Sequence, residues 1–571
     1  MTTSKQVKEL FSAADLAVLT GANPPTEEQS AVITAPPGQL LVVAGAGSGK
    51  TETIANRLVY WVINAGIVPE SILGLTFTRK AAGEMAARFA LRLERFANLM
   101  ESVQNRQQTA EVTAVLNAAD FDLDQLRQRF DTLAQRGMTP ELLRHPVSVS
   151  TYDSYAGTLL TEFGTLVGRE SGFTTITDAA RYQIMTDVVQ SWTGALGVKR
   201  EGENTKHLIK NLLSLANDTN SHLVDLAEMK QTYRSYLSVA EHLRDSEGSE
   251  LNRTALDRLN AILSAMEFGR NATGVIQAFN ERKQELMMAD FSDQTRETVR
   301  LVEQLPVVGE SQRERFQLVF LDEFQDTSVA QMRFLSGIFR DCAVTAVGDP
   351  NQAIYGWRGA SAASMEDFGD IFCSDPQQLL TRTLSTSWRN DEVILKVANR
   401  ISAELTTAPS PGASGKARRN QGLQPSASKP LRARPGASSG IVYGIQTLTD
   451  IEQSQAVVNF FRLWQAQRVK LQSEGTPTEK LPTAAILCRA KNAIPNLAEA
   501  LRRAGIPYQT RGMQGVLEDP GVRLVRAALE VTDDPEKGAS LLILLDRYRL
   551  GLSDIQAVSY THLTLPTSDL V

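Results

Sequence analysis

The residues with the clearest chemical potential lie in the sequence AGAGSGKT, between an apolar run and a helical pattern. Successive backbone N–H groups of a glycine-rich turn form a nest for anions, and the following helix adds its positive dipole end. In this pattern the lysine reaches the outer phosphates of a nucleotide, and the threonine hydroxyl binds Mg²⁺. The sequence therefore predicts a phosphate-binding loop. Its residues are Ala44, Gly45, Ala46, Gly47, Ser48, Gly49, Lys50 and Thr51.

A second chemical signal is the adjacent acidic pair Asp322 and Glu323, which follows the apolar run LVFL. In phosphoryl transfer from a nucleotide, one acid holds Mg²⁺ and another residue orients the attacking water. We assign Asp322 to the metal and Glu323 to the water. Acidic residues after a strand are often only a solvated turn, but the upstream phosphate loop favours the catalytic interpretation.

A third signal is the stretch VGDPNQAIYGWRGAS, which begins at residue 347. Gln352 follows a predicted strand, at the edge where open sheets bind nucleotides, so its amide is expected to sense the γ-phosphate. Tyr355, Trp357 and Arg358 form an aromatic and cationic group that can stack on bases and pair with phosphates. A buried core tryptophan remains an alternative for Trp357.

The elements that must position these residues follow from the apolar runs. Strands are predicted at 40–44, 72–77, 147–151, 318–322 and 343–349, and they alternate with helical stretches. This order predicts an α/β fold with a doubly wound parallel sheet. Strand signals stop between residues 164 and 312, where a helical inserted subdomain is expected. Further strands are expected at 441–446 and 483–488.

These patterns predict a domain organisation. The first α/β ATPase domain comprises 1–165 and 312–388, interrupted by the helical insertion 166–311, and a second, incomplete α/β domain spans 389–571. The stretch 407–439 is rich in Pro, Ser, Ala and Gly, and its charges are all basic. It should be a disordered loop, because such a composition cannot bury a core.

Composition excludes several classes of protein. The chain has 571 residues, a formal net charge of −6 and 42% apolar residues, which rules out a disordered chain, a fibrous repeat and a disulfide scaffold. The three cysteines and five histidines have no metal-ligand spacing. The N-terminus lacks a signal peptide and no run is long enough to span a membrane, so we expect a cytoplasmic protein without a membrane partner.

Taken together, these motifs resemble the ATP-dependent DNA helicases of superfamily one, the UvrD/Rep/PcrA group. The resemblance runs from Thr26 to about Gly512 and implies RecA-like domains, ATP and Mg²⁺ as cofactors, single-stranded and duplex DNA as partners, 3′-to-5′ movement, and a role in DNA repair or recombination. By this resemblance Gln29 reads adenine, Arg389 contacts the γ-phosphate and Trp388 stacks near the base. The implied DNA contacts are Phe77, Thr78, Arg79, Thr151, Tyr152, Tyr355, Trp357 and Arg358.

Within this group, the sequences GKTET, LTFTRKAAGEM and VSTY are most similar to the actinobacterial AdnA/AdnB helicase–nuclease subunits, which implies a possible second subunit as partner. Two later motifs of the group, around His-x-x-Lys-Gly-Leu-Glu and Thr-Arg-Ala, do not occur before Val571. We therefore expect the N-terminal portion of a longer protein. The alternative to an active helicase is a nucleotide- and DNA-binding, non-unwinding subunit or fragment of a helicase–nuclease complex.

Overall fold

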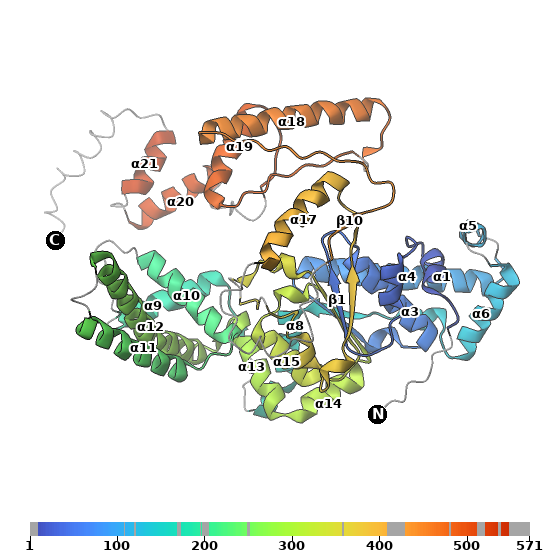
Figure 1. Cartoon of the computed structure of the whole chain (residues 1–571), viewed down its shortest axis with the longest axis horizontal. Coiled ribbons are helices and arrows are strands. Elements are labelled where there is room, and N and C mark those ends of the chain that lie inside the picture. The colour runs from blue at the N-terminus through green and yellow to red at the C-terminus, as the bar shows by residue number, and fades with distance from the viewer. Residues whose placement is uncertain are drawn as a thin grey trace, which may run out of the picture. The chain divides into compact units, whose positions relative to one another are not determined.

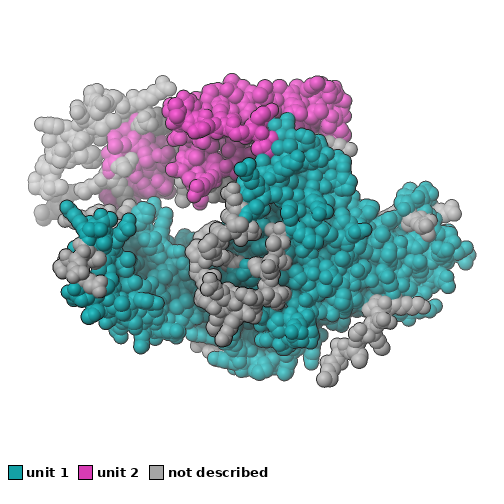
Figure 2. All heavy atoms as spheres, in the orientation of Figure 1, with its two compact units in different colours: residues 1–441 teal, residues 442–571 magenta. Residues whose placement is uncertain are grey.

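The computed structural model describes residues 9–107, 109–118, 121–167, 173–194, 196, 205–247, 252–356, 359–361, 363–407, 429–478, 481–510, 520–534 and 538–547. The chain forms two compact units, residues 1–441 and 442–571, which Figure 2 distinguishes by colour. The candidate residues Trp357 and Arg358 lie outside the described residues.

The first unit contains a six-stranded sheet in the order β3-β2-β6-β7-β1-β8, and all of its strand pairs are parallel. Five of the strands lie where the sequence predicts them, whereas β8 carries the mixed sequence LTRTL, which gives no apolar run, and lies half-buried at the edge of the sheet. The strands are β1 (Leu40–Ala44), β2 (Ile72–Thr76), β3 (Ser148–Thr151), β6 (Leu318–Leu321), β7 (Val344–Gly348) and β8 (Leu380–Leu384).

Helices cover both faces of the sheet, so the predicted α/β, doubly wound fold is confirmed (Figure 1). Along β1, Leu40 and Val42 join one apolar core, and Leu41 and Val43 join the other, because successive strand residues point to opposite faces. The first core holds α1 (Ala13–Leu19), α2 (Glu27–Ile33), α3 (Lys50–Ala65) and α4 (Arg79–Gln104). The second holds α8 (Tyr152–Phe163), α13 (Phe291–Gln304), α14 (Pro306–Arg315), α15 (Val329–Phe339) and α16 (Phe368–Phe372).

The region expected to be helical forms a bundle with its own apolar core, coloured green in Figure 1. Its helices are α9 (Asp178–Ser191), α10 (Thr205–Ser221), α11 (Leu226–Glu247) and α12 (Arg253–Glu285). Two short parallel strands, β4 (Thr174–Thr175) and β5 (Met288–Ala289), pair where the chain enters and leaves this bundle. The exact domain bounds remain a prediction.

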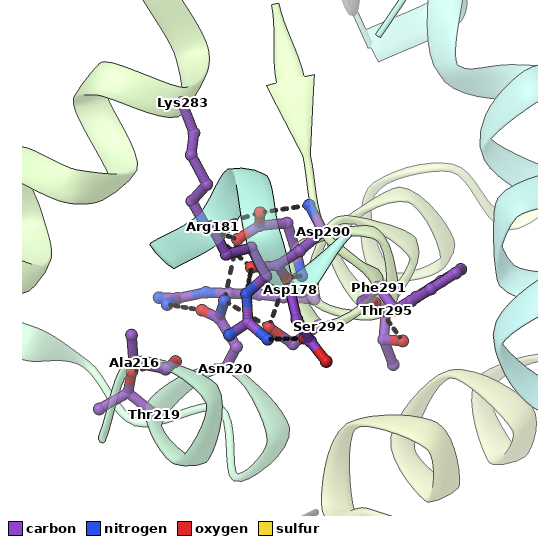
Figure 3. A network of polar contacts seen from close by, with 12 residues as sticks. Asp178, Arg181, Ala216, Thr219, Asn220, Lys283, Asp290, Phe291, Ser292 and Thr295 are labelled. Atoms are coloured by element: carbon purple, nitrogen blue, oxygen red, sulfur yellow. Dashed lines mark hydrogen bonds and ion pairs between the residues drawn. The ribbon is translucent and has the colours of Figure 1, made fainter. Parts of the chain in front are cut away.

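A buried network of charges lies where the bundle meets α13 (Figure 3). The ammonium of Lys283, at the end of α12, is 3.2 Å from a carboxylate oxygen of Asp290 and 2.6 Å from one of Asp293. Arg181 of α9 pairs with the same oxygen of Asp290 at 3.0 Å. Asp290 caps α13, and the side-chain amide of Asn220 in α10 donates to Asp293. The network therefore joins the ends of four helices.

The first unit also contains several shorter or peripheral elements. They are α5 (Ala110–Ala118), α6 (Leu123–Gln135), α7 (Pro140–Leu143), α17 (Glu392–Thr407), β9 (Thr386–Ser387) and β10 (Arg432–Ala433). The expectation of a disordered loop at 407–439 is wrong for its last part, because residues 429–439 dock onto α17 and β9. β10 pairs with β9, and the amide of Asn399 exchanges two hydrogen bonds with the backbone of Leu431. The rest of that loop, 408–428, lies outside the described residues.

The second unit holds α18 (Asp450–Ser473), α19 (Ile494–Arg503), α20 (Pro520–Asp533) and α21 (Gly538–Arg547). The strands expected at 441–446 and 483–488 do not form, because neither segment has a hydrogen-bonded neighbour strand among the described residues. Tyr443 is accordingly 75% exposed and Leu487 95% exposed. In the described part of the chain, no helix combines the length and apolarity needed to cross a bilayer.

Candidate nucleotide-binding and catalytic site

The predicted catalytic residues meet at one edge of the six-stranded sheet. All its strands are parallel, so their carboxyl ends lie at the same edge, where open α/β sheets bind ligands. The phosphate loop follows β1, the acidic pair follows β6, Gln352 follows β7, and Arg389 follows β8. The structure therefore brings together segments that are more than 300 residues apart in the chain.

The phosphate loop needs glycine for its backbone and for close approach. Gly47 and Gly49 have positive φ values of 74° and 82°, a region that side chains rarely adopt. A Cβ on Gly47 would also lie 2.7 Å from the Cβ of Arg389 and 2.8 Å from the hydroxyl of Ser387. The backbone N–H of Trp388 donates to the Gly47 carbonyl at 2.8 Å, so the segment after β8 lies directly on the loop.

Lys50 and Glu323 form an ion pair across the site. The Lys50 ammonium is 3.1 Å from Glu323 Oε2, at the start of α3 and the end of β6. Glu323 has a φ of +50°, a strained left-handed conformation that recurs at functional sites. The amide of Gln325 donates to the same Glu323 oxygen at 2.8 Å. Gln325 is a residue that the motif analysis missed, because its role depends on the turn after β6.

Asp322 is buried and has an unused acceptor. Burial, and then repulsion from Glu323, raise the pKa of Asp322 to about 7. Its Oδ1 has no hydrogen-bond partner among the described residues. A buried carboxylate oxygen without a partner costs free energy unless a ligand satisfies it, and Mg²⁺ prefers such hard oxygen ligands. These features fit the metal role assigned to Asp322.

Other buried polar atoms without hydrogen-bond partners lie on the same segments. The hydroxyls of Ser48, Thr76 and Ser387 and Oδ1 of Asp326 all lack a partner in the described part of the chain. The described residues contain no group of three His, Cys, Asp or Glu side chains arranged for a metal. This composition suits Mg²⁺, which usually binds one or two carboxylates together with substrate phosphates and waters.

Gln352 is linked to the acidic pair through neighbouring polar groups. Its amide donates to Asp349 Oδ2 at 2.6 Å, and the backbone N–H of Asp349 donates to Gln325 Oε1 at 3.0 Å. Since Gln325 also contacts Glu323, a short chain of hydrogen bonds runs from Glu323 to Gln352. This chain of bonds links Gln352, the predicted γ-phosphate sensor, to Glu323, the predicted water-orienting residue, through Asp349 and Gln325.

Gln29 lies beneath the phosphate loop. Its side chain caps α2 together with Thr26, and its Nε2 donates to the Ser48 carbonyl at 3.2 Å. Adenine reading by Gln29 remains a prediction, as does base stacking by Trp388, which is 42% exposed beside the loop.

The candidate DNA contacts divide into two groups. Phe77, after β2, and Tyr355, after β7, lie with ring centroids 4.7 Å apart, and Thr78 and Arg79 are exposed beside them. Tyr152, by contrast, is 1% exposed and donates its hydroxyl to the Asp322 carbonyl at 2.8 Å. Thr151 is also buried and caps α8. A direct DNA contact by these two residues does not fit this burial, because the Tyr152 hydroxyl is used at Asp322 and the Thr151 hydroxyl is used in capping α8.

The comparisons with known proteins agree with this geometry. Residues 25–372 match the UvrD/REP helicase N-terminal domain. The chain is 27% identical over 548 residues to ATP-dependent DNA helicase UvrD1 of Mycobacterium tuberculosis, covering 94% of this chain and 56% of the relative. It is 24% identical over 517 residues to UvrD2 of the same species, covering 90% and 59%. It is 24% identical to the helicase PcrA of Staphylococcus epidermidis over 549 residues, covering 93% and 57%.

The chain thus spans somewhat more than half the length of these relatives. The matched residues include the sheet strands β1, β2, β3, β6 and β7 but not β8, and they include the helical insertion and the motifs that carry Lys50, Asp322 and Gln352. The chain belongs to the UvrD/REP helicase family.

Proposed function

We propose that this chain carries the ATP-hydrolysing motor of a DNA helicase that moves 3′ to 5′ along single-stranded DNA, in DNA repair or recombination. The observation that supports this most is the convergence of Lys50, Asp322, Glu323 and Gln352 at one sheet edge. The names of the relatives, which are ATP-dependent DNA helicases, support the same function.

In the proposed reaction, the phosphate loop binds the nucleotide phosphates through its backbone N–H groups and Lys50. Mg²⁺, held by Asp322 and the Thr51 hydroxyl, would neutralise charge between the β- and γ-phosphates. When Lys50 turns toward the phosphates it leaves Glu323, whose freed oxygen then accepts a hydrogen bond from the attacking water. Arg389 adds positive charge at the γ-phosphate.

Single-stranded DNA would bind where Phe77, Thr78, Arg79 and Tyr355 lie. An aromatic pair offers π-faces on which bases stack, and an exposed arginine binds phosphate. The loop that carries Tyr355 begins directly after Gln352, so the nucleotide and DNA sites share one short segment. This connection gives hydrolysis a route to movement on DNA. A second helicase–nuclease subunit as partner remains a prediction.

The proposal predicts ATP hydrolysis by the purified chain that single-stranded DNA stimulates. Lys50→Ala should reduce turnover by roughly 10²–10³-fold, the usual effect of removing one positioned charge-stabilising donor. The exposed Lys470→Ala is the matched control, because Lys470 pairs with the exposed Glu474 at the end of α18, away from the phosphate-loop and DNA-contact motifs in the sequence. A Lys50→Ala variant that hydrolyses ATP like the unmodified chain would refute the phosphate-loop assignment.

Strand displacement tests the helicase part separately. Duplexes with a 3′ or a 5′ single-stranded tail should differ, with ATP-dependent displacement from the 3′-tailed duplex only. Displacement from the 5′-tailed duplex would refute the proposed polarity. Hydrolysis without displacement from either duplex would refute unwinding by this chain and favour a non-unwinding motor subunit.

A further inference from the structure

Helix α2 is held between the phosphate loop and the segment that follows β8. At its first turn, both carboxylate oxygens of Glu28 accept hydrogen bonds from Ser385, one from the backbone N–H and one from the hydroxyl, each at 2.7 Å. One residue further along, the Gln29 amide donates to the phosphate-loop carbonyl of Ser48. Adjacent residues of one helix therefore contact two different segments of the site.

The other end of α2 is fixed as well. The guanidinium of Arg57, in α3, is fully buried and donates to the carbonyls of Val32, Ile33 and Ala35 and to the hydroxyl of Thr345 in β7. These bonds satisfy carbonyls at the carboxyl end of α2, which otherwise lack partners. The helix cannot shift along its axis without breaking bonds at both ends.

Ser385 begins the segment that presents Arg389. It is 4% exposed, and it is followed within four residues by the Trp388 N–H that donates to Gly47 and by Arg389, whose Cβ packs on Gly47. Hydrogen bonds to a carboxylate are stronger than those to a neutral acceptor, so Glu28 contributes a firm anchor at the start of this segment.

We propose that Glu28 is a positioning residue that holds the segment 385–389 against the phosphate loop, so that Arg389 is placed for the γ-phosphate. Glu28 acts through Ser385, which has no role in nucleotide contact in this proposal. The inference rests on the proposed nucleotide site, and it adds to that site the residue Glu28 and its hydrogen bonds to Ser385.

The test compares nucleotide binding by variants of the whole chain. Affinity for a non-hydrolysable ATP analogue is measured against affinity for ADP, because the ratio reports the contacts to the γ-phosphate alone. Glu28→Ala should lower this ratio by about tenfold, the value of one charged hydrogen bond. Glu28→Gln keeps one acceptor oxygen, so its affinity ratio should lie between those of Glu28→Ala and the unmodified chain. Glu27→Ala, at the exposed neighbouring position of the same turn, should leave the ratio unchanged.

A double-mutant cycle separates positioning from general damage. If Glu28 acts through Arg389, then adding Glu28→Ala to an Arg389→Ala chain should cause no further loss in the ratio. Additive losses would overturn the proposal, and so would an unchanged ratio in Glu28→Ala alone. A melting temperature that falls equally for Glu28→Ala and Glu28→Gln, with equal loss of ADP binding, would show a structural role and overturn it too. An unmodified chain that binds no nucleotide would instead refute the proposed function.

Discussion

Two buried polar clusters in this chain have opposite characters. At the junction between the helical bundle and α13, Lys283, Asp290, Asp293 and Arg181 all have charged partners. At the carboxyl edge of the sheet, Asp322 and several hydroxyls are buried with acceptors that the described residues leave unsatisfied. In the first arrangement every carboxylate has a cationic partner within the chain, whereas the second leaves acceptors that a bound ligand would satisfy.

The pKa values of Asp290 and Asp322 differ in this sense, although burial and repulsion from Asp290 raise the pKa of Asp293 within the paired network. Burial opposes ionisation of both carboxyls. At Asp290 the ammonium of Lys283 and the guanidinium of Arg181 overcome that opposition and lower the pKa to about 2. At Asp322 burial is reinforced by Glu323, and the pKa rises to about 7. A buried carboxyl with surplus negative potential is typical of sites that bind a cation, and a neutralised one is typical of structural networks.

Removing the cation of the paired network should have the largest effect. Lys283→Ala leaves two buried carboxylates without their ammonium, which should lower the free energy of unfolding by about 3–5 kcal/mol. Urea unfolding followed by circular dichroism measures this change. Lys80→Ala, which breaks an exposed pair, should change it by less than about 1 kcal/mol. If both substitutions lowered the free energy of unfolding equally, the network around Lys283 would be no more stabilising than an exposed ion pair.

Removing the charge at Asp322 should raise the free energy of unfolding, whereas Lys283→Ala should lower it. Since the folded-state pKa is raised above the ordinary value of 3.8, the unmodified chain loses stability as the pH rises from about 4 to about 7. Asp322→Asn removes that loss, so in metal-free buffer it should stabilise the chain above pH 7 by up to about 4 kcal/mol.

Asp290→Asn is the counterpart of this variant. Because the folded pKa of Asp290 is lowered, its carboxylate contributes stability above about pH 4 that is lost as the pH falls toward about 2. Asp290→Asn should therefore destabilise the chain at pH 7. The melting temperatures of both variants are measured across a range of pH. If Asp322→Asn lowered the melting temperature at pH 8, the raised pKa of Asp322 would be contradicted.

The aromatic pair should give the smallest effect. Phe77→Ala should weaken binding of single-stranded DNA by about 1–3 kcal/mol, the value of one base stack, with nucleotide affinity unchanged. Fluorescence anisotropy with a labelled oligonucleotide measures the DNA affinity. Leu91→Ala, at an exposed apolar position on α4, is a control that should bind DNA normally. Unchanged DNA binding in Phe77→Ala would remove this pair from the proposed interface.

Much of the candidate site was predictable because the sequence patterns that indicate it are local. A glycine loop before a lysine, and an apolar strand ending in two acids, identify themselves over a few residues. The edge strand β8 was not predictable, since a half-buried strand of mixed polarity has no apolar run. Gln325, Glu28 and Arg57 were missed for a related reason: their roles depend on partners that only the folded chain brings near.

The prediction of strands at 441–446 and 483–488 was wrong for a different physical reason. Apolar runs such as 441–446 have the composition of strands, but a strand forms only when a neighbour supplies its hydrogen bonds. Tyr152 shows a similar limit at one residue, because an aromatic side chain within a predicted DNA-contact motif can equally pack inward, as it does beneath Asp322.

We infer that the cluster of unsatisfied polar groups at the carboxyl edge of the sheet is a site of nucleotide hydrolysis. Glu323→Gln tests it most directly, because the amide keeps the shape of the side chain but loses the charge that holds the water. Nucleotide binding with Mg²⁺ and ATP turnover are measured on the same preparation in the presence of single-stranded DNA. We expect Glu323→Gln to bind nucleotide nearly as well as the unmodified chain and to turn it over at least a hundredfold more slowly, about 2.7 kcal/mol or more. Turnover at the unmodified rate, or loss of nucleotide binding together with loss of the fold, would contradict it.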